Sequence, residues 1–196
     1  FGGQEILVSA GSKAIYAYDP ADGKEAWRVE ARKSHSGSAT PVFGKDLIYS
    51  CTGFSKGDLL AIRPGGSGVV TDTHVQWTVG RNIPCKPSVQ LVGDLLFMID
   101  DGGIASCLEA TTGGEVWRER IAGNYSAAPL HASGRVYFFS EEGKTTVIEA
   151  GRMFKVLAEN TLGDGFMASA AVAGKALILR SRTHLYRVEG GALAAK

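Results

Sequence analysis

The stretch Ala-Ser-Cys-Leu-Glu-Ala-Thr-Thr-Gly-Gly-Glu-Val-Trp, residues 105–117, decides the fold of this chain. It has the pattern of one strand, a turn of Thr and Gly, and a second strand that ends on tryptophan. A near copy occupies residues 16–27, and in both copies the turn glycine precedes the tryptophan by four residues (Gly23 and Trp27, Gly113 and Trp117). The chain is therefore predicted to use one β-hairpin module repeatedly.

The spacing of the tryptophans indicates the period of the repeat. They fall at positions 27, 77 and 117, at intervals of 50 and 40 residues. A further 40 residues lead to Leu157, so we expect a fourth copy in which leucine replaces the tryptophan. Between the modules lie Gly-centred turns that are each followed by an apolar run, at residues 47–50, 95–98, 136–139 and 176–179. Repeats of about 40–50 residues are typical of propellers, solenoids or arrays.

The repeated unit identifies the architecture. Four short strands joined by hairpins, in a unit of about 40 residues, are typical of a propeller blade. We predict an all-β fold, a β-propeller of four-stranded antiparallel blades of which only about half of the ring is present. A single propeller domain covers residues 1–196, with approximate blades at 1–30 (partial), 31–79, 80–120, 121–160 and 161–190 (partial), followed by a C-terminal tail at 191–196.

A blade leaves both of its faces uncovered until its neighbours stack against it. We therefore expect Trp27, Trp77 and Trp117 to dock between adjacent blades, where each indole N–H donates to a carbonyl oxygen. The longer first interval has a local cause, because extra residues fall within 64–74. This segment is predicted to form an enlarged hairpin on the rim of one blade.

Composition excludes several classes of function. The chain has 21 basic and 20 acidic residues and no block of like charge, so nothing indicates binding to nucleic acid or to an anionic membrane. No apolar run has the length of a membrane span. The cysteines at 51, 85 and 107 lack a CxxC spacing, and the sequence leaves open whether they are buried thiols or include one disulfide. The histidines have no metal-ligand spacing, so no metal site is predicted.

The hairpin module also resembles a known family. The residues Ala17, Asp19, Gly23, Lys24 and Trp27 resemble the tryptophan-docking motif of the pyrroloquinoline-quinone (PQQ) propeller superfamily, which includes quinoprotein alcohol dehydrogenases and BamB-type outer-membrane assembly lipoproteins. Further segments look like bacterial PQQ-like repeat proteins: 59–64, 71–74, 102–108, 123–127 and 183–187. The resemblance implies a propeller of the eight-bladed type, about twice this length, in a periplasmic or otherwise exported protein.

The quinoprotein branch of this resemblance would imply a Ca²⁺ ion held by acidic and amide side chains, a catalytic Asp and often adjacent cysteines. No two cysteines are adjacent here, and residues 100–103 have the pattern of a hairpin turn. We therefore expect no cofactor and assign no catalytic residue. The alternative is half of a PQQ-dependent oxidoreductase that uses PQQ with calcium, with its catalytic residues in the other half.

A binding surface follows from the topology of this class of propeller. The loops that leave each tryptophan strand, at 33–36, 81–84, 122–125 and 163–166, are expected to gather at one mouth of the central channel. The predicted partner-binding residues are His35, Arg81, Asn82, Asn124, Tyr125, Asp164 and Phe166. We expect a non-catalytic scaffold for a protein or peptide partner in the bacterial envelope, completed by the remaining half of the propeller from the same or another chain. Loops that only connect blades, with no ligand, are the alternative.

Overall fold

The computed structural model describes residues 5–31, 37–53 and 57–190. Over these ranges the strands form five sheets, which we call blades 1 to 5 in chain order. Blade 1 contains β1 (Leu7–Ala10), β2 (Ala14–Tyr18), β3 (Glu25–Glu30) and the distant β7 (Gly68–Val69); blade 2 contains β4 (Val42–Gly44), β5 (Leu47–Cys51), β6 (Leu59–Ile62) and β8 (Val75–Val79). Blade 3 contains β9 (Gln90–Val92), β10 (Leu95–Ile99), β11 (Ile104–Glu109) and β12 (Glu115–Arg120); blade 4 contains β13 (Leu130–Ala132), β14 (Arg135–Phe139), β15 (Lys144–Glu149) and β16 (Val156–Thr161); blade 5 contains β17 (Ala171–Ala173), β18 (Ala176–Arg180) and β19 (Leu185–Glu189).

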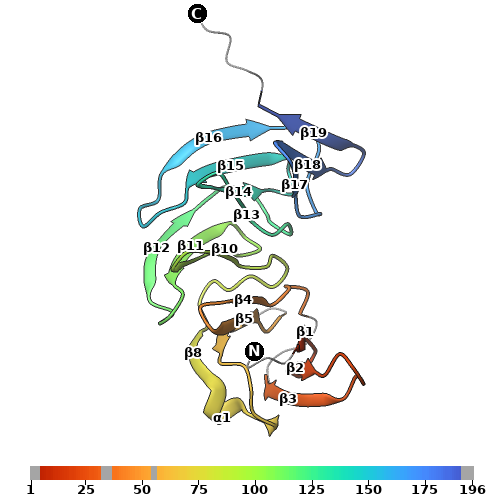
Figure 1. The fold of residues 1–196 in the computed structure, drawn as a ribbon. Coiled ribbons are helices and arrows are strands. Elements are labelled where there is room, and N and C mark those ends of the chain that lie inside the picture. Colours follow the sequence, from red (N-terminus) through yellow and green to blue (C-terminus); the bar gives the residue numbers. More distant parts are fainter. Residues whose placement is uncertain (1–4, 32–36, 54–56, 191–196) are drawn as a thin grey trace, which may run out of the picture.

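The blades follow one another along an arc, from blade 1 at the red end of the chain to blade 5 at the blue end (Figure 1). Blades 2, 3 and 4 each have four antiparallel strands, and the described part of blade 5 has three. The fold is therefore the predicted all-β partial propeller. Two strands depart from the predicted blade ranges: β7 joins blade 1, and β16 continues to Thr161. The predicted tail at 191–196 lies outside the described residues.

In blades 2 to 5 the hairpin between the first and second strand contains backbone in the left-handed conformation that favours glycine. Gly93 lies at φ 59° and Gly134 at φ 71°, a left-handed conformation that matches the twist of a two-residue hairpin. Lys45 and Asp46 adopt φ values of 54° and 57° without glycine. The turns that the sequence pattern marked are therefore the turns of the structure.

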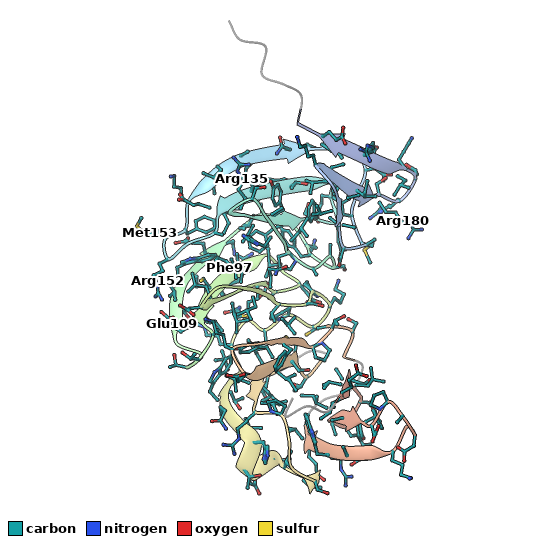
Figure 2. All side chains as sticks on the ribbon, in the orientation of Figure 1. Phe97, Glu109, Arg135, Arg152, Met153 and Arg180 are labelled. Carbon is teal, nitrogen blue, oxygen red and sulfur yellow. The ribbon has the colours of Figure 1, made fainter. Side chains whose placement is uncertain are left out.

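The core lies between blades rather than inside them. Along β10 successive side chains point to opposite faces, and all five are buried because both faces of the blade are covered. Leu96 and Met98 face blade 2, whereas Phe97 and Ile99 face blade 4 (Figure 2). At the outer rim, Arg152 of blade 4 donates through its two terminal guanidinium nitrogens, Nη1 and Nη2, to the Glu109 carboxylate of blade 3, the Nη2 bond measuring 3.1 Å. Figure 2 shows these two side chains side by side.

Two of the three tryptophans bond to the neighbouring blade. Trp77 Nε1 donates to the carbonyl oxygen of Ala110 and Trp117 Nε1 to that of Gly151, both at 3.1 Å. Trp27 is 1% exposed, yet its N–H has no hydrogen-bond partner among the described residues. The expectation that every indole finds a carbonyl therefore fails at Trp27.

The predicted rim hairpin at 64–74 is wrong in its placement. After β6 the chain leaves blade 2, and β7 pairs in parallel with β3 of blade 1 (Trp27 with Gly68, Arg28 with Val69). Val70 N donates to Arg28 O and Glu30 N donates to Thr71 Oγ1, at 2.9 and 2.8 Å. The short helix α1 (Thr71–His74) then leads back to β8. The segment is a strap between two blades.

The predicted replacement of the fourth tryptophan by Leu157 is also wrong. In blade 3, Trp117 pairs with Cys107, and the residue in the same place of blade 4 is Ala158, which pairs with Val147. The β15–β16 turn is one residue longer than the β11–β12 turn, so counting 40 residues misses by one. Ala158 cannot fill the space that an indole fills, and all six residues of β16 are exposed.

Candidate functional site

The loops predicted to form the mouth lie beside a second set of turns at the same end of the sheets. Because the end of β12 pairs with the start of β11 (Arg120 with Ile104), the connection to the next blade lies beside the turn between β10 and β11. The same arrangement recurs in blades 4 and 5 as bridges from Tyr125 to Ser140 and from Phe166 to Ser181. The candidate site is therefore a row of connecting loops. Each loop lies against the turn between the second and third strands of a blade, which we call an inner turn.

The loop between blades 2 and 3 is fixed by two aspartates of the β10–β11 turn. Asn82, in a left-handed conformation (φ 53°), donates through Nδ2 to Asp100 Oδ2 at 3.1 Å. The backbone N–H groups of Cys85 and Lys86 donate to Asp101 Oδ1 at 2.9 and 3.2 Å. These charge-assisted bonds hold the loop in one conformation.

The loop between blades 3 and 4 is held by similar hydrogen bonds, with glutamates in place of the aspartates. Asn124 donates through its side chain to Glu142 at 2.9 Å, and its backbone N–H lies 3.1 Å from the same oxygen. The neighbouring Glu141 accepts from Ser126 Oγ at 2.5 Å and from Lys86 Nζ at 2.9 Å, which links this turn to the preceding loop. The bond from Ser126, followed by that from Lys86, lowers the pKa of Glu141, and the bond from Asn124 lowers that of Glu142.

Blade 5 shows the reverse arrangement, with the acidic side chain in the connecting loop and its hydrogen-bond donors in the inner turn. Asp164 lies in the connecting loop, and the β18–β19 turn supplies the donors. Asp164 Oδ2 accepts from Thr183 Oγ1 at 2.5 Å, Ser181 Oγ at 2.9 Å and Thr183 N at 2.9 Å. These bonds, with Thr183 as the largest cause, lower the pKa of Asp164. The described carboxylates of these three loops and their inner turns thus already accept hydrogen bonds from other groups of the protein.

The structure corrects the expected role of the two aromatic loop residues. Tyr125 is 0% exposed and Phe166 is 1% exposed. Tyr125 packs with the apolar cluster between blades 3 and 4, and its hydroxyl donates to Ala122 O at 3.1 Å. Phe166 lies edge-on to Phe139, with ring centroids 5.8 Å apart. Both rings are anchors that hold the loops down, so neither offers a surface to a partner.

The remaining predicted site residues fall into two groups. Arg81 and Asn124 are exposed at the mouth, whereas Asn82 and Asp164 are half-buried and hold their loops as described. His35 lies outside the described residues. Sequence analysis missed the inner turns, above all Glu141 and Glu142; the signal was present in the acidic pair at 100–101, which looked like an ordinary hairpin turn.

The described residues do not fit a calcium–quinone site. No group of three or more His, Cys, Asp or Glu side chains that could hold a metal ion occurs among them. The mouth carboxylates are taken up by N–H and O–H donors of the loops, as shown above. Cys51 and Cys107 are buried thiols outside any disulfide, and burial raises the pKa of each to about 12. Any quinone ligands therefore have to come from other residues.

Two hollows adjoin blade 1, and neither collects catalytic side chains. The larger, of about 550 Å³, is lined by Glu5, Ile6, Asp19, Pro20, Ala21 and Ala26. The smaller, of about 220 Å³, lies between blades 1 and 2 and is lined by Ile6, Val8, Phe43, Ile48 and Pro64. Within the described ranges, no helix has the length and apolar character of a transmembrane span.

Comparison with known families supplies the name of the fold family. A family model described as outer membrane protein assembly factor BamB matches residues 1–76 and, in an overlapping second copy, residues 66–153. This chain belongs to that PQQ-like repeat family. A comparison with curated proteins gives no match.

Solved structures with a similar fold are found among both natural and designed proteins. BamB from Moraxella catarrhalis aligns with a TM-score of 0.68 and 16% identity, over 90% of this chain and 54% of its own. The computationally designed Ika8 protein aligns with a TM-score of 0.72 and 13% identity, over 93% and 54%. A europium-containing methanol dehydrogenase aligns with a TM-score of 0.51 and 14% identity, over 62% and 24%. The chain spans about half the length of the first two, and these likenesses concern the fold alone.

Proposed function

We propose that this chain is part of a non-catalytic propeller scaffold that binds a protein partner through its mouth loops. The observation that carries the proposal is the repeated bonding of each connecting loop to an inner turn, seen at Asn82, Asn124 and Asp164. Loops held in one conformation before binding lose little conformational entropy when a partner docks. A scaffold of this kind needs no reactive group.

The charges of the mouth indicate the chemistry of the partner. The acidic side chains accept bonds within the protein, whereas the guanidinium groups of Arg81 and Arg182 are exposed. Guanidinium groups favour carboxylates and carbonyl oxygens as bonding partners. We infer a protein partner that presents acidic side chains or main-chain carbonyls to this surface.

Family membership supports a proposal for where this chain acts in the cell and for the process in which it takes part. The matching family is described by its role in outer membrane protein assembly, so we place this chain in the bacterial envelope, on the exported side. Since the chain covers 54% of the BamB structure, we further propose that more blades, from the same or another chain, complete the propeller.

Site-specific photo-crosslinking tests the proposal in bacterial cells that express the complete protein. A photoreactive amino acid at Arg81 or Arg182 is expected to capture one protein of the outer-membrane assembly apparatus. The matched control is Met153, which is 78% exposed on the outer rim, away from the mouth (Figure 2). Equal capture at Met153, or no discrete adduct at either arginine, would contradict the proposed face.

A second measurement addresses the oxidoreductase alternative. PQQ and Ca²⁺ are added to the complete protein, and quinone absorbance and dye-linked alcohol or sugar oxidation are followed. We expect neither a bound quinone spectrum nor turnover. Turnover with added PQQ would replace the scaffold proposal.

A further inference from the structure

Cys51 of blade 2 holds the same place as Phe139 of blade 4. Each is the fifth and last residue of the second strand of its blade, β5 and β14. Both strands pair with the first strand in one register, in which the third residue of the second strand lies opposite the first residue of the first. Because the register is the same, the two side chains point to the same side of their blades.

Cys85 holds the place of an aromatic anchor in the loop between blades 2 and 3. It lies five residues before the first strand of blade 3, as Tyr125 lies five residues before that of blade 4 and Phe166 before that of blade 5. Tyr125 and Phe166 are the two buried rings that hold down the other mouth loops. The loop before blade 3 therefore has a thiol where the other two have a ring.

The repeat brings these two places into contact. Phe139 lies against Phe166, with ring centroids 5.8 Å apart. Ile99, the fifth residue of β10, belongs to the same apolar cluster as Tyr125. In each case the last residue of a second strand packs against the anchor of the following loop. Between blades 2 and 3 both of these places are occupied by cysteine.

Contacts around the two cysteines agree with this placement. Cys51 is 2% exposed and shares an apolar cluster with Ile83, two residues before Cys85. Ser38 Oγ donates to Cys85 O at 3.2 Å, and a Cβ atom added to Gly37 would lie 3.8 Å from Cys51 O, so one short segment touches both backbones. Burial, followed by the neighbouring Cys85, raises the pKa of Cys51 to about 12. One thiol affects the ionisation of another only when the two lie close together.

We propose that oxidation joins Cys51 and Cys85 in a disulfide that fixes the loop between blades 2 and 3 to blade 2. A covalent bond then replaces the aromatic packing that anchors the other two loops. Disulfides form and persist on the exported side of the bacterial membrane. The inference rests on the proposed exported location only for the source of the oxidant, and it does not depend on the partner at the mouth.

The oxidant is a disulfide, which reacts by exchange. The thiolate of the half-buried Cys85 attacks one sulfur of the oxidant, forms a mixed disulfide and releases the other sulfur as a thiolate. Cys51 then loses its proton and attacks Cys85 Sγ, which releases the second thiolate of the oxidant. The two cysteines lose two electrons and two protons in total, and the oxidant is reduced to two thiols.

The test exposes the folded, complete protein to oxidised glutathione. Remaining thiols are alkylated in denaturant, and peptide mapping by mass spectrometry reports each thiol and each link. Cys51→Ser and Cys85→Ser remove one partner each, and Cys107→Ser is the matched control, because Cys107 is 0% exposed in the cluster between blades 3 and 4.

Oxidation in urea supplies a reference for the unfolded chain. Cys85 lies 34 positions from Cys51 but only 22 from Cys107. Since a shorter loop closes at a smaller loss of entropy, the unfolded chain should favour the link between Cys85 and Cys107. The folded protein is expected to favour the longer loop, because the fold places its ends together.

In the folded protein we expect the Cys51–Cys85 link to be at least tenfold more abundant than any other link among the three cysteines, with Cys107 still alkylated. C107S should keep the link, and in C51S the thiol of Cys85 should carry glutathione, the mixed disulfide of the first step. Continued alkylation of Cys51, a dominant link to Cys107, or an unmodified Cys85 in C51S would overturn the inference. Failure of the crosslinking at Arg81 would leave the link unchanged, so the two proposals can fail separately.

Discussion

At the scale of single residues, the three tryptophans that mark the repeat differ in what their indole N–H groups do. Trp77 and Trp117 donate to carbonyls of the next blade, and Trp27 is buried with no partner for its N–H among the described residues. The cause is local: the segment after β6 turns away to form β7, so the turn that would offer a carbonyl to Trp27 is not there. A buried donor without an acceptor costs free energy that the other two sites do not lose.

Replacing tryptophan by phenylalanine separates the bond from the packing. Trp117→Phe loses one ring and the bond to Gly151 O, whereas Trp27→Phe loses only the ring. We expect W117F to lower the free energy of unfolding by about 1 kcal/mol more than W27F does. Urea denaturation of the two variants measures the difference. Equal losses of unfolding free energy in the two variants would show that the hydrogen bond from Trp117 Nε1 makes no net contribution to stability.

At the scale of elements, the strap from β7 to α1 is the largest departure from a regular blade. It gives the edge of β3 a parallel strand, and a threonine hydroxyl continues the pairing where the strand ends, because Thr71 Oγ1 accepts from Glu30 N at 2.8 Å. Covering an edge strand in this way removes a site for unwanted strand pairing. The strap also joins blade 1 to blade 2 by backbone bonds, in addition to the apolar contacts between them.

The hydroxyl of Thr71 can be removed with almost no change of shape. Thr71→Val removes the hydroxyl that accepts the hydrogen bond from Glu30 N, and we expect a loss of about 1 kcal/mol in unfolding free energy. Amide exchange at Glu30 should accelerate with it. Thr78→Val, at an exposed position of β8, is the matched control and should change neither quantity. Unchanged exchange at Glu30 in T71V would show that the bond does not hold the strap.

At the scale of the whole molecule, the protein is an arc in which each blade is stabilised mainly by its neighbours. Blade 3, between two complete blades, buries all of β10. Among the described residues, blade 5 has a neighbouring blade on one side, and β19 is exposed over most of its length. In such repeat architectures stability is close to a sum over neighbouring interfaces, so it should fall toward the end of the arc.

Hydrogen exchange followed by mass spectrometry checks this gradient. Amides of β10 and β11 should exchange slowest, and those of β18 and β19 at least tenfold faster. Ala158 stands at the place where blade 3 has Trp117, so no indole joins blades 4 and 5 there, which adds to the effect. Equal protection of blades 3 and 5 would indicate one cooperative unit and contradict the additive description.

The sequence by itself determined the scaffold. The spacing of Trp27, Trp77 and Trp117 and the glycine turns between them follow from local backbone geometry and a fixed repeat length, so the blades and their order could be predicted. The end of the sheets at which the connecting loops lie could be predicted for the same reason, because the antiparallel strand order determines it. A one-residue change in turn length was enough to put the fourth tryptophan position at Ala158 rather than Leu157.

Only the tertiary structure decided which side chains of those loops are available. In the sequence, Tyr125 and Phe166 resemble aromatic residues that bind a partner. In the structure, the neighbouring blades bury both side chains. The path of β7 joins residues of two blades, and the bonds that link Asn124 to Glu142 and Asp164 to Ser181 span 18 and 17 residues within one repeat. Repeated local pattern therefore fixes the blades, whereas contacts between blades, which no single repeat encodes, decide what faces solvent and what faces the core.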